Sequence, residues 1–84
     1  MIQRSRKKAA PRGVEIDWPK VGRRIRELRG FDMSQEEFAK RIGVSQNYLS
    51  VMEHGGAEIG AGILLAIGRQ FGKSLEWLLT GEDG

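Results

Sequence analysis

The chain contains no cysteine, and this absence removes several kinds of chemistry. Without thiols there are no disulfides, no thiolate nucleophile and no thiolate zinc site. The absence also fits a reducing compartment. The single histidine, His54, has no second histidine at the spacing of a metal site, so we expect no metal ion and no other cofactor.

Long apolar runs are also missing from the sequence. No stretch approaches the roughly 20 apolar residues of a membrane-spanning helix, and the N-terminus lacks the apolar core of a secretory signal. We therefore expect a soluble, cytoplasmic protein. The chain has no glycine-rich phosphate loop and no spaced carboxylate pair, and no histidine base accompanies its serines. These absences argue against an enzyme.

Charge is unevenly distributed along the 84 residues. The net charge is +3, yet residues 1–14 hold five basic side chains and no acidic one, which leaves nine basic against eleven acidic side chains in the rest. Together with Pro11, Gly13 and a lack of apolar periodicity, this predicts a flexible basic arm over residues 1–14 and one domain over residues 15–84. The arm either binds phosphate groups or reaches into a groove of a partner, or it is only a solubilising leader, and the sequence leaves these interpretations open.

Apolar spacing predicts five helices and no strand, and hence an all-α fold. The first helix is expected over residues 18–29, because apolar residues three and four positions apart form one stripe there: Trp18, Val21, Ile25 and Leu28. Pro19 suits the first turn of this helix, and Gly30 suits its end.

Two helices with a tight turn between them are expected next. Ser34 and Glu37 have the spacing of a capping box, which predicts a short second helix that ends at Gly43. Ser45 can cap a third helix that runs to about His54.

A fourth helix is expected over roughly residues 61–71, although it contains Gly62 and Gly68. A glycine inside a helix costs up to about 1 kcal/mol relative to alanine. These glycines either leave the helix marginal or allow close packing. Ser74 can cap a last short helix, in which Trp77 is expected to join the core.

The third helix has two different faces when its residues are placed at steps of about 100°. Leu49 and Met52 lie on the face that points into the protein. The opposite face is small, mostly uncharged and rich in groups that both donate and accept hydrogen bonds: Gln46, Asn47, Ser50, Val51 and His54. An amide can pair with adenine, a serine hydroxyl can serve several bases, and a valine can lie against a thymine methyl. A helix reads the major groove with its N-terminal residues, so we expect Gln46, Asn47, Ser50 and Val51 to read bases.

These residues belong to a longer pattern, Gln35-x-x-x-Ala39-x-x-x-Gly43-Val44-Ser45-x-x-x-Leu49-Ser50-x-x-Glu53-x-Gly55. The pattern resembles the helix-turn-helix of the Cro and lambda-repressor-like transcription regulators. The likeness extends over roughly residues 17–82. It implies a compact five-helix DNA-binding domain, in which the second and third helices form the helix-turn-helix.

The resemblance also implies contacts with the DNA backbone. Gln35, at the start of the second helix, matches a residue that typically holds a phosphate with its side chain and the helix N-terminus. Ser45 and Tyr48 are likewise placed for phosphate. Arg24 on the first helix is a further candidate for a phosphate contact. The alternative is that Arg24 only belongs to the solvent-exposed face of that helix.

Glu53 matches a position that is often paired with an arginine from the first helix. We expect it to be structural, with Arg24 or Arg29 as its partner. The loop after the third helix lacks the basic residues that relatives frequently have near the DNA backbone, so fewer phosphate contacts are expected from that side.

The sequence therefore predicts a sequence-specific regulator of double-stranded DNA, of the repressor type, that reads the major groove with its third helix. The family implies a homodimer on a near-palindromic operator. The alternative is a protein-interaction module of the same fold that binds another regulator or a toxin. Gln35, Gln46, Asn47 and the basic arm favour DNA. Neither a membrane nor a small-molecule effector is indicated.

Overall fold

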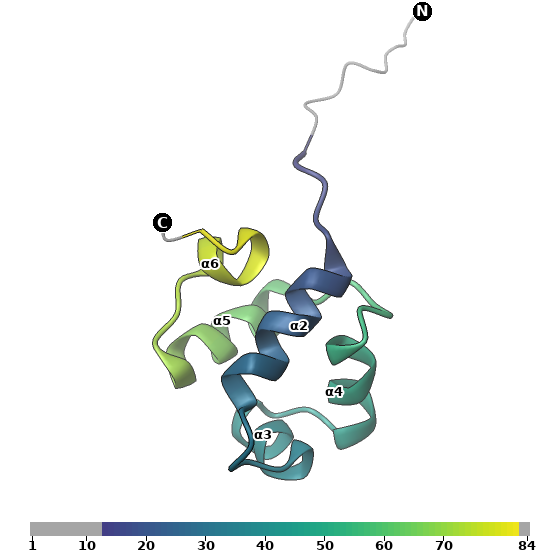
Figure 1. The fold of residues 1–84 in the computed structure, drawn as a ribbon, viewed down its shortest axis with the longest axis vertical. Coiled ribbons are helices and arrows are strands. Elements are labelled where there is room, and N and C mark those ends of the chain that lie inside the picture. Colours follow the sequence, from purple (N-terminus) through teal and green to yellow (C-terminus); the bar gives the residue numbers. More distant parts are fainter. Residues whose placement is uncertain (1–12, 83–84) are drawn as a thin grey trace, which may run out of the picture.

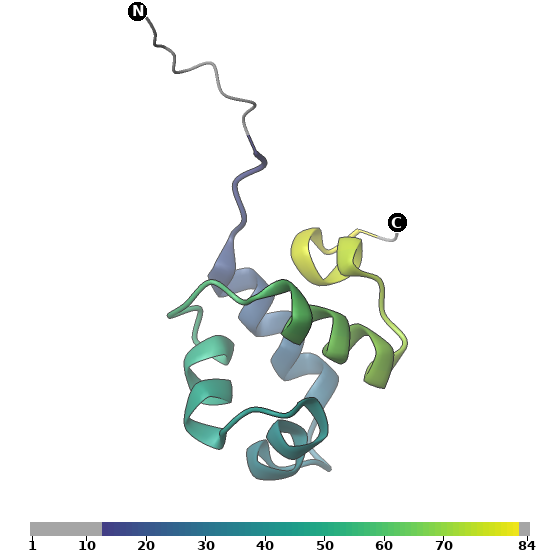
Figure 2. The ribbon, with the colours of Figure 1, turned by 180° about the vertical axis from the view of Figure 1, so that it is seen from behind.

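The computed structural model describes residues 13–82, and within them the protein folds into five helices without a strand. The predicted all-α fold is confirmed. The helices are α2 (Trp18–Arg29), α3 (Gln35–Ile42), α4 (Gln46–Glu53), α5 (Ala61–Phe71) and α6 (Leu75–Thr80). In Figure 1, α2 crosses the front of the molecule, with α4 on one side and α6 on the other. Figure 2, the view from behind, shows α5 in front, and this helix packs against α3 and α6.

Most of these helices begin at a side-chain cap. A side-chain oxygen accepts the backbone N–H three residues further on, at distances of 3.0 to 3.2 Å, from four capping residues: Asp17, Ser34, Ser45 and Ser74. The three predicted serine caps are confirmed, and Asp17 is an additional one. The capping box is only half formed, since the carboxylate of Glu37 accepts a hydrogen bond from Arg41 at 3.1 Å.

The helices enclose one apolar core. Its buried members come from every helix and from the loop before α5: Val21, Ile25, Phe38, Ala39, Ile42, Leu49, Met52, Ile59, Leu64, Ile67 and Leu78. The rings of Phe38 and Phe71 stack with centroids 4.7 Å apart, which joins α3 to α5. Trp18 and Trp77 are only partly buried and pack at the edge of this core. The inward direction predicted for Leu49 and Met52 is confirmed.

Two glycines leave room for the backbone of another segment, which is the end of α4 at Gly22 and the loop after α5 at Gly68. A Cβ atom added to Gly22 on α2 would collide with the backbone oxygens of Met52 and Glu53 at the end of α4, the second of these at 2.6 Å. A Cβ atom at Gly68 would meet the carbonyl oxygen of Lys73 at 2.6 Å, whereas Gly62 faces open space. Close packing therefore accounts for Gly68, and Gly22 sets how near α2 lies to α4.

A buried ion pair connects the ends of three helices. Arg29, the last residue of α2, donates from Nε and Nη2 to the two carboxylate oxygens of Glu53 on α4, at 2.8 and 3.0 Å. Gln35, the first residue of α3, donates from Nε2 to Oε1 of the same carboxylate at 2.9 Å. The side chain of Glu53 is only 3% exposed. The predicted structural role of Glu53 is confirmed, and its partner is Arg29.

The environment of Glu53 decides its charge. Burial alone raises the pKa of its carboxyl group, but hydrogen bonds from Arg29 and Gln35 and the positive charges of Arg29 and Arg26 outweigh that effect and hold the pKa below its usual value. Since the pKa is lower in the folded chain than in the unfolded chain, the ionised carboxylate stabilises the fold at neutral pH. This contribution is lost as the pH falls from about 4.5 through the folded pKa.

Replacement of Gly22 by alanine is expected to lower the free energy of unfolding by about 1–3 kcal/mol, because the added methyl group forces α2 away from α4. Urea denaturation followed by circular dichroism measures the change. The matched control is Gly62→Ala, which adds the same methyl group in open space and is expected to raise stability by at most about 1 kcal/mol. Equal effects of the two substitutions would contradict the close approach of α2 and α4.

Replacement of Glu53 by glutamine is expected to lower the free energy of unfolding at pH 7 by about 3 kcal/mol, because it leaves the guanidinium of Arg29, which is only 15% exposed, without its counter-charge. The difference between wild type and variant should shrink as the pH falls from about 5 to 3, since protonation removes the same charge from the wild type. Urea denaturation at a series of pH values tests both statements. Glu37→Gln, at the exposed pair with Arg41, serves as the control and is expected to cost less than about 0.5 kcal/mol. A difference that stays constant down to pH 3 would rule out the ionised pair.

Candidate functional site

The outer face of α4 carries the side chains that were predicted from the sequence to read DNA bases. Gln46 and Asn47 are exposed at the first turn of the helix, and Val51 is 43% exposed one turn further on. Ser50 lies between them and is half-buried. The reverse face is buried under the rest of the domain. The predicted division of this helix into an inner and an outer face is confirmed.

The turn between α3 and α4 fixes how α4 projects. Gly43 adopts the left-handed conformation, with φ of 80°, as expected for the residue that ends α3. The backbone N–H of Val44 then donates to the carbonyl oxygen of Ala39 at 3.0 Å, which closes the end of α3. Ala39 is buried where α3 packs against α4.

His54 completes the outer face at the C-terminal end of α4. Its Nδ1 lies 2.7 Å from the carbonyl oxygen of Ser50. Because a carbonyl oxygen only accepts, Nδ1 carries the proton in this contact, and in the neutral ring Nε2 is left as an acceptor. The sequence predicted His54 at the end of this helix and on its outer face. Both predictions are confirmed, since His54 occupies the cap position of α4 and is exposed one helical turn after Ser50.

The candidates for phosphate lie at the starts of α3 and α4. Ser45 is exposed, and its hydroxyl accepts from the backbone N–H of Tyr48 at 3.0 Å. The side chain of Tyr48 is half-buried beside it. Gln35 is half-buried and uses one amide hydrogen for Glu53, which leaves its second amide hydrogen as a donor.

Arg24 is not brought to this group. Its Nη1 donates to the carbonyl oxygen of Leu78 at 2.9 Å, and its guanidinium packs against Gly81. Arg24 therefore joins α2 to the end of α6, away from the face of α4. The choice between Arg24 and Arg29 depends on which side of α2 meets α4, and the sequence did not settle it.

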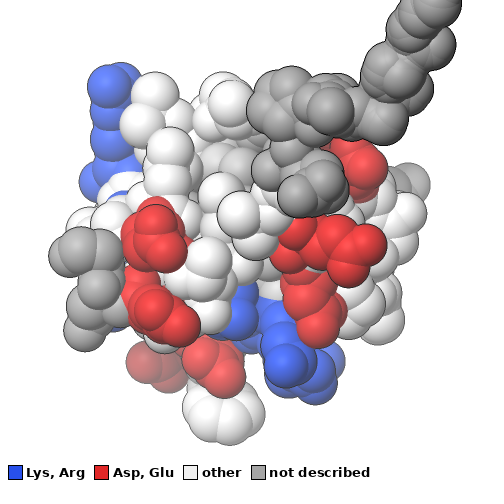
Figure 3. All heavy atoms as spheres, turned by 90° about the horizontal axis from the view of Figure 1, so that it is seen from above, with Lys and Arg blue, Asp and Glu red and all other residues white. Residues whose placement is uncertain are grey.

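Charged side chains are unevenly distributed over the surface. In the view of Figure 3, acidic side chains gather in two groups, and basic side chains lie at the bottom of the view beside them and at the upper left. Residues 1–12, which form most of the predicted basic arm, lie outside the described part of the chain. Within residues 13–82 no helix is long and apolar enough to cross a membrane, and no cluster of acidic or histidine side chains could hold a metal ion.

The helix-turn-helix family model matches residues 23–78 of this chain. The propionyl-CoA carboxylase regulator of Cereibacter sphaeroides is 37% identical over 63 residues, which make up 74% of this chain but 14% of that relative. This chain thus spans a small part of the length of the curated relative that it matches.

Solved structures also resemble this chain. The P22 c2 repressor in complex with a synthetic operator has a TM-score of 0.68 and 32% identity, over 74% of this chain and 96% of the repressor chain. The restriction-modification controller protein C.AhdI from Aeromonas hydrophila has a TM-score of 0.67 and 28% identity, over 75% of this chain and 97% of that chain. The resemblance seen in the sequence is thereby confirmed, and the chain belongs to the Cro and lambda-repressor-like family of helix-turn-helix regulators.

Proposed function

We propose that this domain binds double-stranded DNA in a sequence-specific way, with α4 in the major groove, and that it acts as a repressor-type regulator. Two copies related by a two-fold axis bind a near-palindromic operator. Their half-sites lie about one helical turn, ~34 Å, apart, because both reading helices must enter successive major grooves on one side of the duplex.

One observation carries this proposal. Gln46 and Asn47 are exposed together at the N-terminal tip of α4, while Leu49 and Met52 are buried behind them. In this geometry the core holds the helix and leaves both amides available to base edges. Each amide can form a two-pronged pair with adenine, and the methyl groups of Val51 suit the methyl group of thymine.

The residues beside this tip suit the DNA backbone. Ser45 and the second amide hydrogen of Gln35 offer donors near the N-termini of α4 and α3, where the helix dipoles favour an anion. The complex of the P22 c2 repressor with an operator supports the same use of this fold. A module that binds only proteins would not require an exposed amide pair at the tip of a helix.

Selection of bound duplexes from a random pool tests the function directly. A palindrome with defined spacing is expected. Replacement of Gln46 or Asn47 by alanine should then weaken binding to the selected duplex by about 1–3 kcal/mol and relax the preference at one base position in each half-site. Gln70→Ala, which removes an exposed amide from α5, is the matched control and should leave both properties unchanged. Unaltered discrimination by both α4 variants in a competition assay would refute base reading.

The basic arm gives a separate prediction. Deletion of residues 1–12 removes all five basic side chains of the arm, so binding to every duplex should weaken alike and become less dependent on salt. The slope of log K against log salt concentration, measured for the selected duplex and for an unrelated one, reports the loss. An unchanged slope would show that the arm does not contact phosphate.

A further inference from the structure

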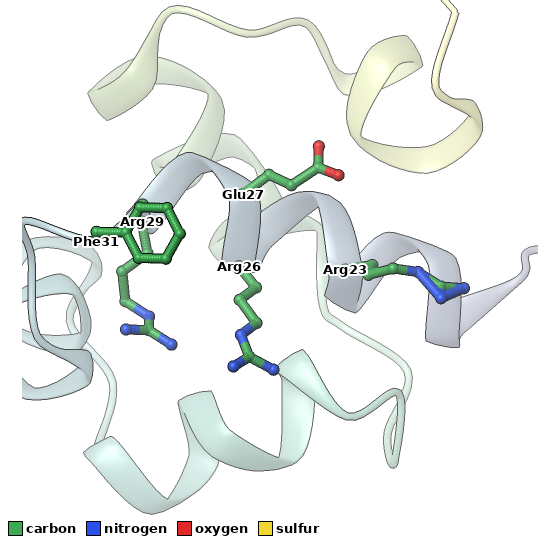
Figure 4. A pocket seen from close by; sticks show the side chains of 6 residues that line it. Arg23, Arg26, Glu27, Arg29 and Phe31 are labelled. Carbon is green, nitrogen blue, oxygen red and sulfur yellow. The ribbon is translucent and has the colours of Figure 1, made fainter.

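An aromatic side chain projects from the loop that joins α2 to α3. Phe31 is fully exposed and stands beside Arg29 at the end of α2 (Figure 4). It borders a hollow of about 480 Å³, which Arg23, Arg26 and Glu27 also line. The side chains of Arg26 and Glu27 leave α2 in opposite directions (Figure 4), and the two arginines outnumber the one glutamate at this hollow. A single exposed apolar residue is common on protein surfaces, and Phe31 is distinguished by a matching hollow at the other end of α2.

That second hollow lies beside the chain that leads into α2. Its volume is about 630 Å³, and its apolar lining comes from Val14, Ile16 and Trp18. Val14 is 80% exposed, whereas Ile16 and Trp18 are half-buried. Glu15 and Glu58 supply the charge at this hollow.

We propose that these two surfaces bind each other between neighbouring copies of the chain. Phe31 of one copy enters the hollow formed by Val14, Ile16 and Trp18 of the next. Arg23 and Arg26 of the first copy then face the two glutamates of the second. No other described residue forms an ion pair with any of these four charged side chains. The contact thus combines burial of a phenyl ring with complementary charge.

The geometry makes this contact a head-to-tail one. The two surfaces lie at opposite ends of α2, a helix of 12 residues and therefore about 18 Å long. Each contact uses Phe31 of one copy and the hollow of the next, so repetition of the contact gives a row of copies with one aromatic side chain and one hollow free at its two ends. It is therefore distinct from the two-fold interface proposed for the operator-bound dimer.

The contact is too small to hold copies together in free solution. One phenyl ring and two ion pairs bury far less than the roughly 1,200 Å² of a stable interface. DNA that holds two copies side by side raises their effective concentration, and there a weak contact becomes measurable. This step rests on the proposed DNA binding. Burial of one phenylalanine predicts a gain of about tenfold when adjacent sites are filled.

Arginines alone would suit a phosphate backbone equally well, but an exposed phenyl ring would gain nothing from phosphate. A hollow that is both apolar and acidic suits a partner that is both apolar and basic. The surface around Phe31 has that combination, which favours a second copy over DNA and over an unrelated protein.

The absence of cysteine from the chain allows a direct test. One batch of protein carries Asp32→Cys, next to the projecting ring, and another carries Val14→Cys, at the hollow. On a long duplex of mixed sequence, a short bis-maleimide reagent should join the two different variants and should not join two copies of the same variant. Phe31→Ala in the Asp32→Cys protein should abolish the product. Leu65→Cys mixed with Leu75→Cys provides the control for other exposed apolar positions. Failure of the first pair to form a product above this control would overturn the contact.

Binding to one and to two adjacent copies of the selected duplex gives the second test. The wild type should fill the two-site duplex with about tenfold cooperativity. Phe31→Ala and Arg26→Glu should reduce this ratio to about one, and Arg26→Glu combined with Glu58→Arg in one chain should restore it, because each contact pairs position 26 of one copy with position 58 of the next.

Single-site affinity separates the two hypotheses. If the wild type does not bind a duplex with one site, the proposed function itself is refuted. Normal single-site binding with a wild-type ratio near one would refute only the head-to-tail contact. A Phe31→Ala variant that weakens single-site binding and keeps the ratio would place this ring on DNA and would also overturn the contact.

Discussion

The ion pair between Arg29 and Glu53 holds the rest of the structure in register. It lies where α2 ends, α3 begins and α4 ends, and the amide of Gln35 completes its hydrogen bonds. A charge buried in this way stabilises a fold only when its partners are present, because the loss of one partner leaves the other charge without solvent. The pair therefore ties the orientation of α4 to the first half of the chain. Gly22 acts at the same junction by allowing α2 to approach the backbone of α4.

The helix α4 needs this ion pair because it is short. An isolated helix of eight residues such as α4 is not stable in water, so its conformation depends on packing against neighbours. Leu49 and Met52 supply the apolar contacts of α4, and Glu53 supplies a polar one. Packing connects the five helices in a closed circuit, from α2 through α4, α3, α5 and α6 back to α2. The side chains on the outer face of α4 do not stabilise the fold, apart from the contact of His54 with the carbonyl group of Ser50.

Local features of the fold were predictable from the sequence, because they depend on residues close together along the chain. The first and fourth helices coincide with the residues predicted, and the caps at Ser34, Ser45 and Ser74 follow from the affinity of a serine hydroxyl for backbone N–H groups. The faces of α4 follow from helical periodicity alone. These two kinds of evidence are enough to locate the candidate site.

Features that depend on which helices meet were not predictable in the same way. Arg24 and Arg29 are both arginines on one helix, and only the packing of α2 decides that Arg29 meets Glu53 while Arg24 meets the end of α6. Gly22 looks like an ordinary helical glycine until α4 is placed against it. Gln35 shows the same limit, since the sequence did not predict that its amide donates to the buried carboxylate of Glu53. Because Nε2 has two hydrogens, the proposed contact of Gln35 with a phosphate would use the second hydrogen of a donor that Glu53 already orients.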